Sequence, residues 1–154
     1  MKKIAFHISN FSFRGTEIAT FDYSYYNKHF LKNKSYICCF KSCFINPDFN
    51  ELALKKFSNE FKINIFENIL EYNKFLLENK IQFIYIIKYG LKNDEIPFSI
   101  PTFIHCVFTN KESHGDLYVG VSKSVVKNSN IPFLEHIVHL PELSSNYRKE
   151  LNIP

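Results

Sequence analysis

The chain has 154 residues, 45% of them hydrophobic, with 19 Lys and Arg against 15 Asp and Glu for a formal net charge of +4. This length predicts one domain over residues 1–154 with a sizeable core. The lysines are scattered among acidic residues, whereas nucleic-acid-binding proteins present a concentrated basic stripe, so no nucleic-acid partner is expected. No apolar run reaches the roughly 18 residues of a transmembrane helix. The mild positive charge is compatible with contact at a membrane surface but gives no support for it.

The aromatic and cysteine content bears on the interior of the protein. Seventeen Phe and nine Tyr predict an unusually aromatic core. Cys38 and Cys39 are neighbours in a strand-like run, so their side chains point to opposite faces, and Cys43 and Cys106 complete no metal or disulfide spacing. We therefore expect buried free thiols, no bound metal, and a reducing, cytoplasmic location.

The first thirty residues predict a strand, a loop and a long helix. Residues 3–8 form a short apolar strand, and the loop after it ends in Arg14-Gly15-Thr16-Glu17. A helix is expected over residues 16–31, where apolar side chains recur at helical spacing. Glu17 falls in its first turn, where a negative charge suits the helix dipole.

The rest of the chain continues this alternation. Further strands are expected at 35–40, 62–66, 82–88, 102–108 and 117–121, with a short one around 136–140. Further helices are expected at 48–60, 68–79 with Asn68 as its cap, 122–128, and 144–151 as one or two turns. The run 82–88 is apolar without alternation, as in a strand buried on both faces. The order predicts an α/β fold, a Rossmann-like three-layer sandwich with a mainly parallel sheet.

The loop before the first helix is the first candidate site. Ligands of open α/β folds bind beyond the carboxyl ends of the strands, and the free N–H groups of a helix start suit an anion such as a phosphate. The loop lacks both the dinucleotide fingerprint and the P-loop motif, which argues against a classical dehydrogenase or a P-loop enzyme. Arg14 is a candidate anion contact or simply an exposed charge, and Gly15 alone is a weak signal.

Histidines supply the other candidates. His105 lies in the carboxyl half of an apolar strand, where a neutral imidazole can bond a sugar hydroxyl or orient a reacting group; the alternative is a core histidine bonded to backbone. His114, in a polar loop, has the same two interpretations. His136 and His139 are expected to face opposite sides, which argues against a zinc pair.

Three segments of the sequence resemble the N-terminal half of the retaining, family-four-like glycosyltransferases of the GT-B fold. They are KIAFHISNFSFRGTEIATFDYSYYN, IPTFIHCVFTNKESHGDLYVGVSKSVV and PFLEHIVHLPELSSNYRKELNIP. The resemblance covers nearly the whole chain, and its specificity lies in the order and spacing of short motifs. It implies an acceptor-side Rossmann-like domain facing a cleft.

The resemblance also implies roles for single residues. Arg14-Gly15-Thr16-Glu17 matches the loop that faces the cleft, where Gly15 and Thr16 would offer backbone donors to a phosphate or acceptor. His105 matches a histidine that contacts the donor sugar near the reacting centre, which makes it the catalytic candidate, with His114 as a further substrate contact. Val121-Ser122 matches the following strand-to-helix step, and His139-Leu140-Pro141 the approach to the interdomain linker.

The expected function is transfer of a sugar from a nucleotide-sugar donor to a saccharide or lipid-linked acceptor, without cofactor. The donor-binding C-terminal domain is absent from these 154 residues, so turnover is expected to need a separate domain or subunit. The alternative is a non-catalytic module that binds a sugar or nucleotide, or an interaction subunit. A flavodoxin-like regulator is a weaker option, because no acidic phosphoacceptor cluster is recognisable.

Overall fold

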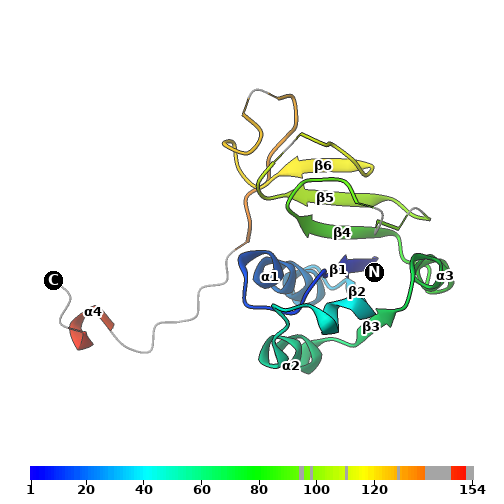
Figure 1. The fold of residues 1–154 in the computed structure, drawn as a ribbon, viewed down its shortest axis with the longest axis horizontal. Helices are drawn as coiled ribbons and strands as arrows, with labels where there is room; N and C mark the ends of the chain where they lie inside the picture. The colour runs from blue at the N-terminus through cyan, green and yellow to red at the C-terminus, as the bar shows by residue number, and fades with distance from the viewer. Residues whose placement is uncertain (94–95, 98, 110, 128, 138–146, 152–154) are drawn as a thin grey trace.

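The computed structural model describes residues 1–93, 96–97, 99–109, 111–127, 129–137 and 147–151 (Figure 1). The strands are β1 (Lys3–His7), β2 (Lys34–Phe40), β3 (Ile63–Phe66), β4 (Phe83–Lys88), β5 (Thr102–Cys106) and β6 (Leu117–Gly120). The helices are α1 (Gly15–His29), the 3-10 helix η1 (Lys41–Ile45), α2 (Glu51–Glu60), α3 (Ile69–Glu78) and the short α4 (Tyr147–Glu150).

The sheet confirms the predicted fold class. Its six strands lie in the order β3-β2-β1-β4-β5-β6, and every neighbouring pair is parallel. From β1 the chain passes to β2 on one side, whereas from β4 it passes to β5 on the other. The connections therefore diverge between β1 and β4, and such a switch point leaves a crevice beyond the carboxyl ends of the two strands.

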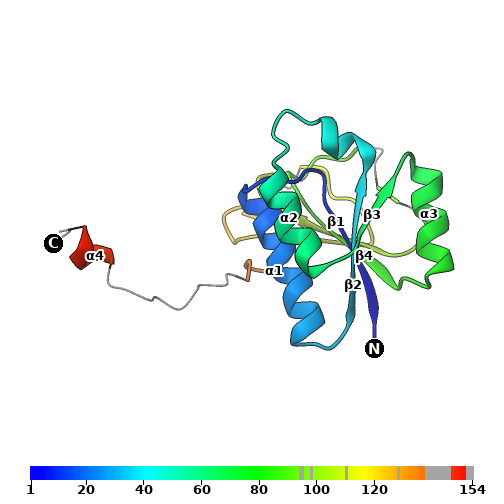
Figure 2. The ribbon, with the colours of Figure 1, turned by 90° about the horizontal axis from the view of Figure 1, so that it is seen from below.

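Three layers are visible when the sheet is seen along its edge (Figure 2). Helices α1 and α2 cover one face, where a buried cluster contains Phe11 and Phe57. Helix α3 covers the other face, where Tyr72 and Leu76 pack against the strands. The two clusters follow from the alternation along β1, because Phe6 points to the first face and Ala5 to the second. The predicted aromatic core is confirmed.

Most predicted elements agree with the structure to within a few residues, but the helix expected at 122–128 is wrong. Residues 123–127 form turns, held by bonds from the N–H groups of Val125 and Val126 to the Ser122 carbonyl at 3.1 and 3.4 Å. The segment is short, and two β-branched residues disfavour helix nucleation. The strand around 136–140 and the start of the helix at 144–151 lie partly outside the described residues.

The four cysteines are free and buried, as predicted. Burial raises the pKa of the Cys38 thiol to about 12, so this thiol stays protonated near neutral pH. None of the helices in the described part has both the length and the apolar character of a membrane-spanning segment.

Asn68 caps α3, as predicted from the sequence. Its Oδ1 accepts bonds from the N–H groups of Leu70 and Glu71, each at 3.0 Å. We expect Asn68→Ala to lower the free energy of unfolding by about 1 kcal/mol, because two helix N–H groups lose their acceptor. Asn68→Asp, which keeps the acceptor, should retain most of the stability. Urea denaturation followed by circular dichroism measures both, and equal loss in the two variants would contradict the capping role.

Candidate functional site

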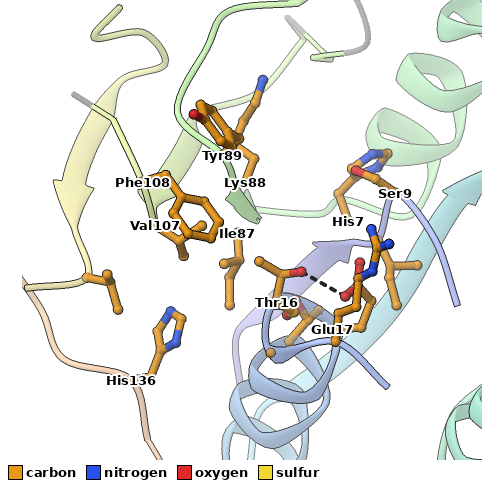
Figure 3. Close-up of a pocket in the computed structure, with 15 residues that line it drawn as sticks. His7, Ser9, Thr16, Glu17, Ile87, Lys88, Tyr89, Val107, Phe108 and His136 are labelled. Carbon is orange, nitrogen blue, oxygen red and sulfur yellow. Dashed lines mark hydrogen bonds between the residues drawn. The ribbon is translucent and has the colours of Figure 1, made fainter. Parts of the chain in front are cut away.

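A pocket of about 730 Å³ opens beyond the carboxyl ends of β1 and β4, where the connections diverge (Figure 3). Its volume falls within the roughly 300–1,000 Å³ typical of small-molecule sites. The lining residues come from the ends of β1, β4, β5 and β6, from the start of α1 and from the segment after β6. They are His7, Ile8, Ser9, Arg14, Gly15, Thr16, Glu17, Thr20, Ile87, Lys88, Tyr89, Val107, Phe108, Val121 and His136.

The start of α1 forms one wall of the pocket, to which Arg14, Gly15 and Thr16 contribute. The N-cap residue Arg14 makes no side-chain cap bond. No atom lies within 4 Å of the place where a Cβ on Gly15 would stand, so this position is open towards the pocket. The Thr16 hydroxyl donates to Glu17 Oε2 at 2.7 Å, and Glu17 is only 8% exposed. The wall therefore carries a buried carboxylate beside the helix N-terminus.

The Arg14 guanidinium forms an ion pair with Asp48, a residue that does not line the pocket. Its Nη2 lies 2.8 Å from Oδ2 of Asp48, and both side chains are exposed. Asp48 follows η1, and its N–H donates to Asn46 Oδ1 at 2.9 Å. A ligand anion would compete with Asp48 for Arg14, so the predicted anion contact remains a prediction.

The ends of β4 and β5 form the rim. The rings of Tyr89 and Phe108 lie with centroids 5.1 Å apart and planes 31° apart, and both side chains are largely exposed. Lys88 precedes Tyr89, and its Nζ donates to Asn93 Oδ1 at 2.7 Å. An exposed aromatic pair at a pocket mouth is a flat apolar surface on which a planar or pyranose ring can stack.

The wall opposite α1 contains His136. Figure 3 shows His136 on one side of the pocket and Thr16 and Glu17 on the other. Its Nε2 is buried and has no hydrogen-bond partner among the described residues. Burial lowers the pKa of His136 below its ordinary value, so the ring is neutral near pH 7.

His105 lies behind His136 and does not line the pocket. The side chain is 0% exposed, and its ring centroid is 4.7 Å from that of His136. Its Nε2 donates to the Leu134 carbonyl at 2.7 Å, so in the neutral ring Nδ1 accepts from the Tyr85 hydroxyl at 2.6 Å. Burial, with a smaller effect of His136, lowers its pKa to about 4. These contacts match the alternative of a core histidine, and a ligand contact by His105 stays a prediction.

His114 lies away from the pocket. Its Nδ1 is bonded to the Glu112 carbonyl, and its ring packs on Tyr118, whose side chain belongs to the core under α3. Burial lowers the pKa of His114. The structure therefore brings Arg14, Gly15 and Thr16 together and leaves His105 and His114 outside this group. Val121 lines the pocket, whereas His139-Leu140-Pro141 lies outside the described residues.

Sequence reasoning missed several lining residues. Lys88 ends β4, Tyr89 follows it and Phe108 lies just beyond β5, so the rule that ligands bind beyond the carboxyl ends of strands could have found them. His136 had no such signal, because it lies in an irregular segment. Among the described residues, no group of three His, Cys, Asp or Glu side chains is placed to hold a metal ion.

Comparisons of the chain with protein-family models, with curated proteins and with solved structures gave no match. A function for this chain has to be inferred from the geometry and chemistry of the pocket.

Proposed function

We propose that this chain binds a neutral, hydroxyl-rich sugar ligand in the pocket and serves as the acceptor-side domain of a GT-B-type glycosyltransferase. The observation that carries the proposal is the buried carboxylate of Glu17 inside the pocket. A carboxylate accepts hydrogen bonds from hydroxyl groups but repels a phosphate, and it stands at the helix N-terminus that a phosphate would otherwise use. The site suits the acceptor sugar better than the donor diphosphate.

Two further features support a sugar ligand. The exposed pair Tyr89 and Phe108 offers an apolar surface to the C–H face of a pyranose ring. Gly15 leaves room for a ligand to approach the backbone of α1. Aromatic stacking, a carboxylate and backbone donors together match the amphipathic surface of a sugar, which presents hydroxyl groups at its edge and C–H groups on its face.

The nucleotide-sugar donor is assigned in this proposal to a separate domain or subunit. Tyr89 and Phe108 line the pocket and are exposed, and so are Phe13, which directly precedes the lining residue Arg14, and Leu91, two residues after Tyr89. Exposed apolar groups around a pocket are typical of surfaces that meet a partner. The second candidate function is a non-catalytic sugar- or nucleotide-binding module, for which the pocket of about 730 Å³ is already large enough to hold a small molecule.

The ligand class is tested by NMR titration of the ¹⁵N-labelled chain with neutral methyl glycosides, with a nucleotide sugar and with inorganic phosphate. We expect the glycosides to shift the amide signals of residues 15–17 and 88–89. Glu17→Gln should weaken glycoside binding about fivefold, because a charge-assisted hydrogen bond becomes a neutral one. Glu51→Gln, which changes the first-turn acid of α2 outside the pocket, is the matched control. Binding of phosphate alone, strengthened by Glu17→Gln, would contradict the proposal.

The transferase role is tested separately, by release of nucleoside diphosphate from nucleotide sugars. The chain by itself should give no turnover, and addition of a donor-binding half should restore it. Glycoside binding that never leads to turnover with any such half would favour the binding module instead.

A further inference from the structure

An irregular segment, residues 132–137, runs beside β6 and contributes His136 to the lining of the pocket. It joins the edge of β6 through Gly120, whose N–H donates to the Pro132 carbonyl at 3.0 Å and whose carbonyl accepts from the Leu134 N–H at 2.8 Å. This pairing is a single parallel bridge between Gly120 and Phe133. The segment has no helix or longer strand of its own, so other contacts must fix its position.

The buried side chain of His105 and the half-buried side chain of Tyr23 supply those contacts. His105 from β5 donates to the Leu134 carbonyl at 2.7 Å, and the Tyr23 hydroxyl from α1 donates to the Glu135 carbonyl at 2.9 Å. The two peptide groups directly before His136 are therefore held from two elements of the core. Binding residues commonly lie on loops that a rigid scaffold holds in position, as it does here.

His136 receives its orientation from the same two residues. Its ring stands edge-on to His105, at 4.7 Å and 84°, and to Tyr23, at 6.1 Å and 80°. Besides these ring contacts, His136 lines the pocket. The buried Nε2 has no partner among the described residues. A buried polar atom without a partner is uncommon in folded proteins, and a ligand or water usually satisfies it.

We propose that His136 contacts the ligand, with its Nε2 hydrogen-bonded to a hydroxyl group of the bound sugar, and that His105 is the positioning residue that holds it there. The inference rests on the proposed function, since it takes a neutral glycoside as the ligand. It goes further by placing His136, rather than His105, at the ligand.

The chemistry of the imidazole fits a hydroxyl group. A neutral ring nitrogen accepts or, in the other tautomer, donates one hydrogen bond, and a hydroxyl group can do either. A phosphate is bound more strongly by a protonated ring, which the buried environment of His136 disfavours. Across the pocket, Glu17 also accepts from hydroxyl groups, so a sugar ring can be held from both walls.

The experiment uses the full chain labelled with ¹⁵N-histidine and titrated with neutral methyl glycosides. We expect the Nε2 signal of His136 to move on binding. His136→Ala should weaken glycoside binding about five- to tenfold, whereas His136→Gln, which keeps a hydrogen-bonding group, should stay within about threefold. The shift of Nε2 in the unmodified chain does not depend on whether a variant folds.

The positioning role of His105 is tested with a matched pair. His105→Leu removes the donor to the Leu134 carbonyl, and His105→Gln retains one. We expect His105→Leu to speed hydrogen exchange at the amide of His136 and to weaken glycoside binding, and His105→Gln to restore both. Equal effects of the two variants would overturn the positioning role, because lost core packing alone would then explain them.

The remaining outcomes separate this inference from the proposed function. If glycosides bind while the Nε2 signal stays still and His136→Ala binds as well as the unmodified chain, the inference is overturned and the proposed function stands. If no glycoside binds to the unmodified chain, both are overturned.

Discussion

Lowering the pH from 7 to 5 should reduce the free energy of unfolding by about 3 kcal/mol, through His7 and His105. Burial, helped by the charge of Lys88 for His7 and by His136 for His105, lowers the pKa of each from 6.5 to about 4. As the pH falls below 6.5, these histidines become protonated in the unfolded chain but stay neutral in the folded chain. Proton binding therefore stabilises the unfolded state relative to the folded state. The stability is fully present above pH 6.5 and is lost as the pH approaches 4.

The two histidines contribute similar amounts. His7 is 4% exposed and packs against Phe40 and Tyr72 beside the pocket, and His105 is 0% exposed and lies one side chain behind it. The pKa difference alone gives about 2 kcal/mol for each, and we expect about 1.5 kcal/mol each because water in the open pocket screens part of the charge. The pKa of the Glu60 carboxyl is lowered mainly by its bond to Lys28, so this group changes the free energy of unfolding only at more acidic pH.

Urea denaturation at pH 7, 6 and 5 measures this loss, and NMR titration of the histidine rings assigns it. His7→Phe should remove about half of the pH dependence, because phenylalanine suits the aromatic neighbours and cannot take up a proton. Ring signals of His7 and His105 that titrate near 6.5, or equal stability at pH 7 and 5, would contradict the prediction.

Gly90→Ala should lower the free energy of unfolding by about 2–4 kcal/mol, from backbone strain and overpacking together. The φ of Gly90 is +125°, a backbone conformation that alanine rarely adopts, and a Cβ there would stand 1.9 Å from the Thr109 carbonyl oxygen. That oxygen also accepts from Cys106 Sγ at 2.6 Å and from the Tyr118 hydroxyl at 3.0 Å. It therefore cannot move without breaking buried bonds.

Gly15→Ala is the matched control for this substitution. A Cβ at Gly15 meets nothing within 4 Å, so we expect no loss of stability by urea denaturation. The same Cβ occupies the wall of the pocket and should weaken glycoside binding several-fold by NMR titration. Gly90→Ala without destabilisation, or Gly15→Ala as destabilising as Gly90→Ala, would contradict the packing described for these two loops.

Part of the candidate site could be predicted because it follows local patterns. Gly15 and Thr16 stand between an apolar strand and an amphipathic helix, and the parallel topology places every such loop at the carboxyl edge of the sheet. Asn68 was found in the same way, from its position before a helical pattern. Arg14 also reaches the pocket, but no local pattern indicates that Asp48 pairs with its guanidinium, since 34 residues separate the two.

His105 and His136 show which properties of the site follow from the sequence and which depend on the tertiary structure. The sequence by itself determined the alternation of strands and helices, because hydrophobic periodicity is a local signal. It also determined the parallel sheet and the edge on which a site lies, because the rules for connecting strands and helices hold for α/β folds in general. Only the tertiary structure decided that His105 is covered and that His136 faces the pocket. That choice depends on residues 132–137 returning across β6 and β5, held by Gly120, His105 and Tyr23. Contacts between segments so far apart in the chain leave no periodic signal in the sequence.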